Sequence, residues 1–284
     1  MKALTYVIGI LGFLLAAFLL TTAWAQRSFN NNVEREVKLL FKHQGELPQS
    51  RIRAEEIEGL PPAVQRWLTG SGIVGRERVR TVRLRQTGEM RTAPEQSWMP
   101  FTANYYYTVG EPGFIWHADV RAFPLVHLAG RDKLFQGHGN MLIKLFALIT
   151  VADGKGREID QGSLVRYLAE IAWFPSAALS PAISWKELDE DSALATMRVG
   201  DIEVNGTFFF DQEGRLVKFT APRYMERNGT YSLENWRVLL RNHQKIEGVV
   251  LPTEVEVIWD LEQGEFVWFK GQLVDIDFNQ PEFY

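Results

Sequence analysis

The segment Glu158–Pro181, EIDQGSLVRYLAEIAWFPSAALSP, carries the residue types best suited to acid–base chemistry. Asp160 and Glu170 are carboxylates, but catalysis needs a partner that shifts the pKa or shares the proton. Glu170 follows Arg166 by one helical turn, and such a pair holds the carboxylate in its ionised form. We therefore expect a surface-type ion pair worth roughly 0.5 kcal/mol, and we predict no catalytic residue.

Other sequence patterns for chemistry are missing. The five histidines do not follow metal-binding spacing, and the chain contains no HExxH, no GxSxG and no GxxxxGK[ST]. No metal and no cofactor are predicted. A hydrolase or transferase that uses Asp160 or Glu170 beside a histidine remains an alternative.

The composition also limits the partners. The 284 residues carry a net charge of −4, so there is no basic excess to attract phosphates, and nucleic acid is not an expected partner. Cysteine is absent, which excludes disulfides, thiolate metal sites and lipid attachment to cysteine.

The same segment is also predicted to form a helix that covers an apolar space. Asp160 is the expected cap, and Pro175 ends the helix at Phe174. Two of the three faces are apolar, which predicts a mostly buried helix; they consist of Leu164, Tyr167, Leu168 and Ile171, and of Val165, Ala169 and Ala172. Leu168 and Ile171 are expected to pack against a sheet.

Five residues are candidates for ligand binding. Tyr167 combines an apolar ring with one hydroxyl, and Trp173 offers a large apolar surface. Arg166 is the candidate for an acidic headgroup. Trp116, in the apolar strand FIWHADV, and Arg223 complete the set.

The rest of the chain has the pattern of strands. From Arg76 apolar residues alternate with charged ones, and WMPFTANYYYTV continues the period of two. NMLIKLFALITV is expected to be one buried strand, with a helix as the alternative. Asn205-Gly206 and Asn228-Gly229 are both expected to form hairpin turns. Several strands are apolar on both faces, so each face of the sheet needs a cover.

The N-terminus predicts a membrane anchor. ALTYVIGILGFLLAAFLLTTAWA, Ala3–Ala25, is an uncharged run of 23 residues, and a spanning helix needs about 20. The ending Ala-Trp-Ala also fits a signal-peptide cleavage site. We expect an uncleaved anchor at 1–25, a helical lead at 26–72 that includes a short helix at Val33–Phe41, and one β-rich domain at 73–284. Basic residues after the span favour a cytoplasmic domain, but long domains translocate regardless of charge, so an extracytoplasmic domain is expected.

Five blocks carry a resemblance to a known family: LPPAVQRWL, GRDKLFQGHGNM, EIDQGSLVRYLAEIAWFPSAAL, FFFDQEGRLVKFTAPRY and GVVLPTEVEVIW. From Leu60 to Phe278 the chain resembles an uncharacterised bacterial family of membrane-anchored proteins, a domain of unknown function. FxFDxxGRLVxF followed by GVVLP is also similar to the half-barrels of bacterial lipoprotein carriers, although this chain lacks the lipid-bearing cysteine. Neither resemblance supplies functional residues.

The sequence thus predicts an α+β fold: an N-terminal transmembrane helix and a strongly curved antiparallel sheet with the Asp160–Ala172 helix on its concave face. The first functional hypothesis is a membrane-tethered module that binds a lipid or another apolar small molecule between sheet and helix. The alternatives are a scaffold that buries its extra apolar face against a protein partner, and the hydrolase or transferase.

Overall fold

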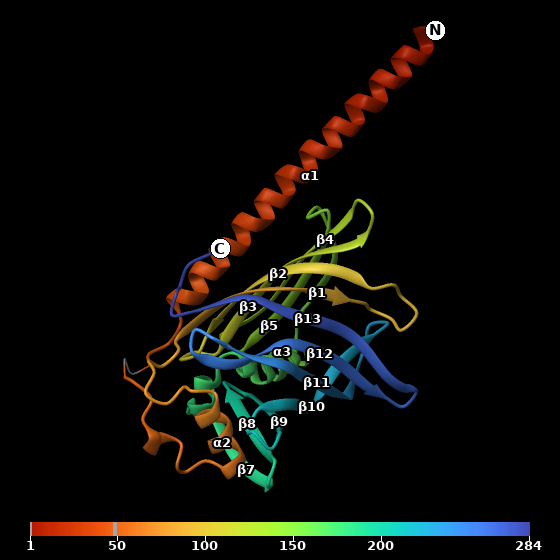
Figure 1. Ribbon diagram of the computed structural model, residues 1–284. Helices are drawn as coiled ribbons and strands as arrows, with labels where there is room; N and C mark the ends of the chain where they lie inside the picture. The colour runs from red at the N-terminus through yellow and green to blue at the C-terminus, as the bar shows by residue number, and fades with distance from the viewer. Residues whose placement is uncertain (1, 48–49) are drawn as a thin grey trace.

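The computed structural model describes residues 2–47 and 50–284 and contains one long sheet with helices on both of its faces (Figure 1). The helical elements are α1 (Lys2–Lys42), η1 (Ala54–Glu56), α2 (Pro62–Gly70), α3 (Arg157–Glu170), η2 (Ile171–Trp173) and η3 (Pro175–Leu179). The strands are β1 (Thr81–Met90), β2 (Met99–Thr108), β3 (Gly113–Phe123), β4 (Val126–Phe135), β5 (His138–Leu145), β6 (Ile149–Gly154), β7 (Ile183–Asp189), β8 (Ser192–Val199), β9 (Ile202–Phe210), β10 (Leu216–Arg227), β11 (Thr230–Ile246), β12 (Val249–Leu261) and β13 (Gly264–Phe278).

The sheet consists of two antiparallel meanders joined along one seam. Its order is β6-β5-β4-β3-β2-β1-β13-β12-β11-β10-β9-β8-β7, so β1 pairs with the last strand. The two edge strands, β6 and β7, are consecutive in sequence, and the chain between them contains α3, η2 and η3. Because the sheet curls, this connection crosses its open side, and α3 packs on β4 and β5 of one meander and on β9 and β10 of the other. The expected half-barrel with a helix on its concave face is confirmed.

The concave face holds the main core. Alternate side chains of β2 point inward, including Phe101, Tyr105 and Tyr107, and all three are buried. Leu168 and Ile171 are fully buried in the same core, as the sequence predicts. At the β7–β9 end, Trp67 of α2 packs against Phe208 and Phe210.

The convex face is covered by the second half of α1. The expected anchor and the expected short helix at Val33–Phe41 form one continuous helix of 41 residues. Its buried side chains pack on the outward-facing Tyr106 and Ile115; they are Ala25, Phe29, Val33, Val37, Leu40 and Phe41. Phe283 and Tyr284 at the C-terminus lie against the same cluster. The apolar outer face of β2–β4 is therefore covered within the chain.

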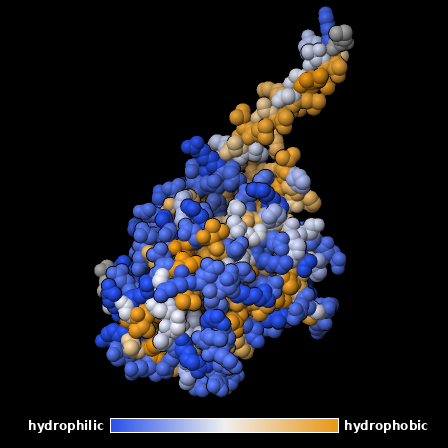
Figure 2. Space-filling view, viewed as in Figure 1, coloured by the Kyte–Doolittle hydropathy of each residue, from blue (hydrophilic) through white to orange (hydrophobic). Residues whose placement is uncertain are grey.

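The first half of α1 projects from the body (Figure 1) and is the most continuously apolar part of the visible surface (Figure 2). Its length and composition are sufficient to cross a membrane, which fits a single-pass anchor or a signal sequence.

Three local expectations were wrong. The run Asn140–Val151 is divided between β5 and β6 by a turn, and these strands are only partly buried because they lie at the sheet edge. Asn205-Gly206 lies inside β9, where the Phe219 ring occupies the space that a side chain at Gly206 would need. Asp160 is not the cap, because α3 begins at Arg157 after Gly156.

The remaining hairpin signal was correct. Asn228 and Gly229 form the β10–β11 turn, both with positive φ angles (52° and 79°).

Candidate functional site

A small cavity lies between α3, η2 and the strands of the β1–β13 seam. Its volume is about 50 Å³. The side chains around it are Gln86, Tyr105, Arg166, Ala169, Glu170, Ala172, Trp173, Arg223, Trp236, Val238, Leu240, Val255, Val257, Trp268 and Phe269. The wall from β11, β12 and β13 is apolar and aromatic, whereas the opposite end holds the charged groups of α3 and β10. The cavity is therefore amphipathic.

Buried charges form a connected network at the polar end. Arg166 Nε donates a hydrogen bond of 2.9 Å to Glu170 Oε1, and its Nη1 donates to Asp132 Oδ2. Glu170 also accepts hydrogen bonds from the hydroxyls of Tyr105 (2.7 Å) and Tyr107 (3.1 Å). The side chains of Arg166, Glu170 and Asp132 are only 11–14% exposed, so the network has little contact with solvent.

Arg223 adds a second cation to this end. Its Nε donates to the carbonyl oxygen of Gly162 (3.0 Å), and its guanidinium lies 4.9 Å from the centre of the Trp236 ring. Among the described residues it forms no ion pair with a carboxylate within 4 Å. Arg223 is therefore the cation at this cavity that is not already neutralised by direct contact.

Burial shifts the pKa values of these groups. Burial raises the pKa of Asp132 to about 7, against the opposing charge of Arg223. It also raises the pKa of Glu170, although Arg166 opposes this shift, and it lowers the pKa of Arg223 to about 10. Such perturbed groups beside a cavity are typical of functional sites.

Several buried polar atoms at the cavity have no hydrogen-bond partner among the described residues. They are both amide atoms of Gln86 and the indole nitrogens of Trp236 and Trp268. Buried polar groups are nearly always hydrogen-bonded, because leaving one unpaired costs about 1–3 kcal/mol. A ligand or water that accepts hydrogen bonds in the cavity would satisfy them.

The structure places three of the five predicted binding residues on the cavity wall: Arg166, Trp173 and Arg223. Trp116 lies behind Arg166, whose guanidinium is 5.3 Å from its ring centre, and its indole nitrogen has no partner among the described residues. Tyr167 is buried away from the wall, and its hydroxyl donates to the carbonyl oxygen of Thr108 (2.8 Å).

The expectation of a surface-type pair at Glu170 was wrong. The i, i+4 spacing indicated its contact with Arg166, but the spacing carries no information about the tyrosines that reach it from β2. Sequence reasoning also missed Asp132 and Gln86. Gln86 had a usable signal, since it falls in phase with Val82 and Leu84 on the apolar side of β1.

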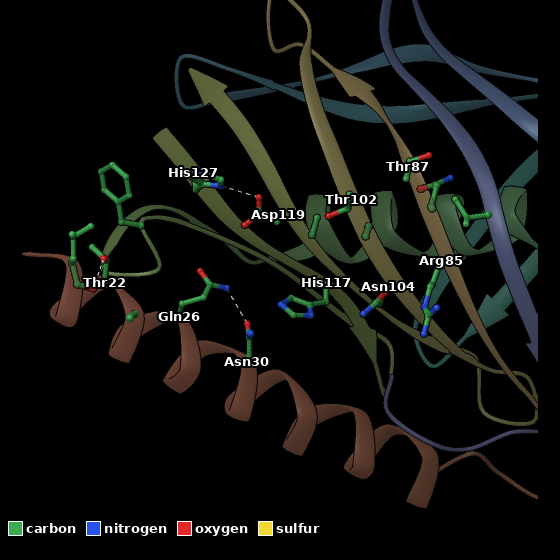
Figure 3. Close-up of a pocket in the computed structure, with 17 residues that line it drawn as sticks. Thr22, Gln26, Asn30, Arg85, Thr87, Thr102, Asn104, His117, Asp119 and His127 are labelled. Atoms are coloured by element: carbon green, nitrogen blue, oxygen red, sulfur yellow. Dashed lines mark hydrogen bonds and ion pairs between the residues drawn. The ribbon is translucent and has the colours of Figure 1, made fainter. Parts of the chain in front are cut away.

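A larger groove of about 730 Å³ lies outside the sheet, between α1 and strands β1 to β4. Thr22, Gln26 and Asn30 line its α1 side, and His117, Asp119 and His127 face them from the strands (Figure 3). His127 Nδ1 lies 3.0 Å from Asp119 Oδ1. Leu19, Phe146 and Val274 add apolar surface to the groove. The side chains of His127 and Asp119 are 42–44% exposed, so the groove lacks the buried charges of the interior cavity.

Elsewhere, His138 Nδ1 lies 3.4 Å from Asp160 Oδ2, but the His138 side chain is 82% exposed. No group of three or more metal-binding side chains occurs in residues 2–47 and 50–284.

The curved antiparallel sheet with its internal helix defines a half-barrel class of protein. Residues 50–271 match the family of unknown function DUF6544, and the chain belongs to this family. No curated protein matches it.

Solved structures with a similar outline are distant. A LolA superfamily protein from Nitrosomonas europaea is 10% identical, with 76% of this chain and 94% of that chain covered and a TM-score of 0.43. A beta-barrel-like protein of domain of unknown function DUF1849 from Brucella abortus is also 10% identical, with 72% and 99% covered and a TM-score of 0.29.

Proposed function

We propose that the protein is a membrane-tethered module that binds a lipid-like amphiphile in the interior cavity. The observation that carries this proposal is the group of unpartnered polar atoms beside an apolar wall. The Gln86 amide and the indole nitrogens of Trp236 and Trp268 offer donors to a polar end. The apolar residues of β11–β13 offer a surface for a hydrocarbon chain.

The charge at the cavity favours a ligand whose polar end is anionic. Arg166 is already bound to Glu170 and Asp132, so it has little charge to offer. Arg223 lacks such a pair among the described residues and lies at the same end of the cavity. We therefore assign the recognition of the anionic end to Arg223, with Arg166 as the group that organises the network beneath it.

A ligand of lipid size needs more room than the closed cavity provides. Ligand pockets usually measure about 300–1,000 Å³, against the 50 Å³ here. The elements on which α3 packs are β4, β5, β9 and β10, whereas β12 is reached by η2. The wall of β11–β13 can thus move away from α3 without breaking the main contacts of the helix. Trp173, whose Nε1 donates to Pro252 O (3.1 Å), lies where this separation would begin.

The hydrolase or transferase alternative was expected to use Asp160 or Glu170 beside a histidine, and His138 does lie beside Asp160, although its side chain is exposed. The His127–Asp119 pair in the outer groove is a second observation of this kind. Neither pair forms a hydrogen bond with a hydroxyl among the described residues, so a nucleophile would have to come from the substrate or from water. The scaffold alternative is weakened by α1, which covers the outer apolar face over β2–β4.

Lipid analysis of the purified full-length chain tests the proposal. The protein is extracted with organic solvent, and bound amphiphiles are quantified per protein by mass spectrometry. Trp173→Ala should lose bound amphiphile to a greater extent than it loses stability. Trp185→Ala is the matched control, because its Nε1 also donates to a backbone carbonyl (Ala178, 3.0 Å) but it does not line the cavity.

Equal amphiphile content in wild type and Trp173→Ala, with both proteins folded, would contradict the proposal. Wild-type protein that contains no amphiphile would contradict it as well.

A further inference from the structure

Three contacts show how far the body of the protein extends along α1. Glu36 of α1 binds Lys133 of β4 (2.7 Å), and Phe29, nearly two turns nearer the N-terminus, packs against His117 of β3 with ring centres 5.9 Å apart. Phe18, three turns further, packs edge-on against Phe146 with ring centres 5.4 Å apart. The body therefore accompanies α1 well into its uncharged N-terminal run.

The β3–β4 turn reaches about the same level as Phe146. Phe123 follows His117 by six residues, which is about 20 Å of strand, and Phe18 precedes Phe29 by eleven residues, which is about 16 Å of helix. The groove supports this direction, since His127, beside the turn at the start of β4, and Asp119 of β3 face Thr22 and Gln26 (Figure 3). In Figure 1 the outer end of β4 points the same way as the projecting part of α1.

Large apolar side chains are exposed at the β3–β4 turn and on β6, next to the β5–β6 turn that contains Phe146. Phe123 is 69% exposed and Leu125 is 88% exposed at the β3–β4 turn, and Ile149 and Val151 on β6 are 60% and 54% exposed. Exposed apolar groups concentrated at one end of a domain mark a contact surface.

At both turns, residues other than glycine adopt positive φ angles. Leu125 has a φ of 69°, and Phe146 and Ala147 have φ angles of 52° and 57°. Glycine or asparagine adopts this left-handed conformation with less strain than leucine or phenylalanine. Leu125 makes little contact with the protein itself, so folding alone does not account for a leucine at this position.

We propose that the β3–β4 turn and the β5–β6 hairpin rest in the interfacial layer of the same bilayer that α1 spans. Phe18 lies seven residues, or about 10 Å, inside the end of the uncharged run at Ala25, which is the depth at which surface-bound apolar groups enter a bilayer. Phe123, Leu125 and Ile149 would then lie among lipid headgroups and the first acyl carbons.

This second contact has a consequence for the outer groove. With α1 and the two turns both in the membrane, the domain cannot rotate freely about its anchor. The mouth of the groove, lined by Thr22 and His127, then lies at the level of the headgroups. The inference rests on the membrane insertion of α1 that forms part of the proposed function, and it does not depend on the interior cavity.

The absence of cysteine from the chain allows a direct test. Leu125→Cys and Ile149→Cys, each labelled with a nitroxide, are placed as full-length protein in nanodiscs of phosphatidylcholine and phosphatidylglycerol. The label's collisions with oxygen, which concentrates in lipid, are compared with its collisions with a water-soluble nickel complex. Leu188→Cys and Leu233→Cys are matched controls, because these leucines are 49% and 55% exposed on strands β7 and β11.

The ratio of oxygen to nickel collisions at positions 125 and 149 should exceed that at 188 and 233 several-fold. Equal ratios at all four positions would overturn the inference. Leu11→Cys, in the middle of the uncharged run, separates the two claims. A high oxygen-to-nickel ratio at position 11 together with low ratios at 125 and 149 would refute only the docking of the turns. A low ratio at position 11 would refute the membrane insertion of α1 and, with it, the docking of the turns.

Discussion

Tyr105 donates a hydrogen bond of 2.7 Å to Glu170, and this contact joins strand β2 to the last turn of α3. The Tyr107 ring stacks on that of Tyr105 with 5.1 Å between centres, and its hydroxyl reaches the other carboxylate oxygen. Desolvation favours the protonated form of Glu170, whereas Arg166 favours the charged form. The carboxylate is thus a structural centre of the polar end of the cavity.

Glu170→Gln should lower the free energy of unfolding by roughly 2–4 kcal/mol. The amide keeps the shape of the side chain, but it removes the charge that faces Arg166 and directs an N–H group towards existing donors. Urea unfolding of the full-length chain in detergent micelles measures the change. Glu203→Gln is the control, since its pair with Arg198 is exposed and should change stability by less than about 1 kcal/mol. Equal effects of the two substitutions would contradict the role of Glu170.

Leu168→Ala and Ile171→Ala should each lower the free energy of unfolding by about 2–5 kcal/mol, the range for a large-to-small change in a core. Both side chains are fully buried between α3, η2 and the sheet. The same urea titration measures the effect, with the exposed Leu233→Ala as a control. Losses below about 1 kcal/mol would mean that the helix is packed more loosely than the structure indicates.

Asp132 should make stability depend on pH. Its folded-state pKa of about 7 exceeds the unfolded value of about 3.9, so the folded protein binds more protons between these values. Stability should therefore fall as pH rises from about 4 to about 7 and then level off, with a total contribution of at most about 4 kcal/mol. Asp132→Asn should lack this component. If unfolding at several pH values gives a constant difference between the variant and the wild type, the pKa of Asp132 is not raised.

Local patterns were sufficient for the sheet but not for every turn. Strand alternation predicted β1 and β2, because side chains of one strand face alternate sides. Asn205-Gly206 has the same letters as Asn228-Gly229 but serves another purpose, since Gly206 makes room for the Phe219 ring. That contact joins different strands, so a short sequence window does not contain it.

The site was only partly predicted, because several of its contacts join segments that are far apart in the sequence. Arg166 and Trp173 were found because both lie in or next to one predicted helical segment with a clear apolar pattern; they belong to α3 and η2 in the structure. The tyrosines that bind Glu170 and the long course of α1 along the convex face arise from tertiary packing. The sequence showed that the outer face needs a cover, but the covering segment lies more than 50 residues before the strands it protects.

The domain should lie outside the cytoplasm. The motivation is the uncharged run of 23 residues at Ala3–Ala25 and the tendency of long domains to translocate. An alkaline phosphatase fused to the C-terminus should be active. The fusion needs a flexible linker, because Tyr284 N donates to the Tyr106 hydroxyl (3.2 Å) and the end of the chain packs beside α1. A silent phosphatase together with an active cytoplasmic reporter would reverse this orientation.

Gln86→Leu should separate stability from binding. Gln86 is 1% exposed on the concave face, and neither of its amide atoms has a partner among the described residues. Leucine of similar size removes the two unpaired groups, so the ligand-free protein should become more stable by about 1–2 kcal/mol. The same change removes a donor from the proposed polar end of the cavity, so the affinity for an anionic amphiphile should fall by about tenfold, the equivalent of one charge-assisted hydrogen bond. Urea unfolding and quantitative lipid extraction measure the two effects. Gln272→Leu, on the exposed face of β13, is the control. A variant that keeps its full amphiphile content would show that Gln86 does not contact the ligand.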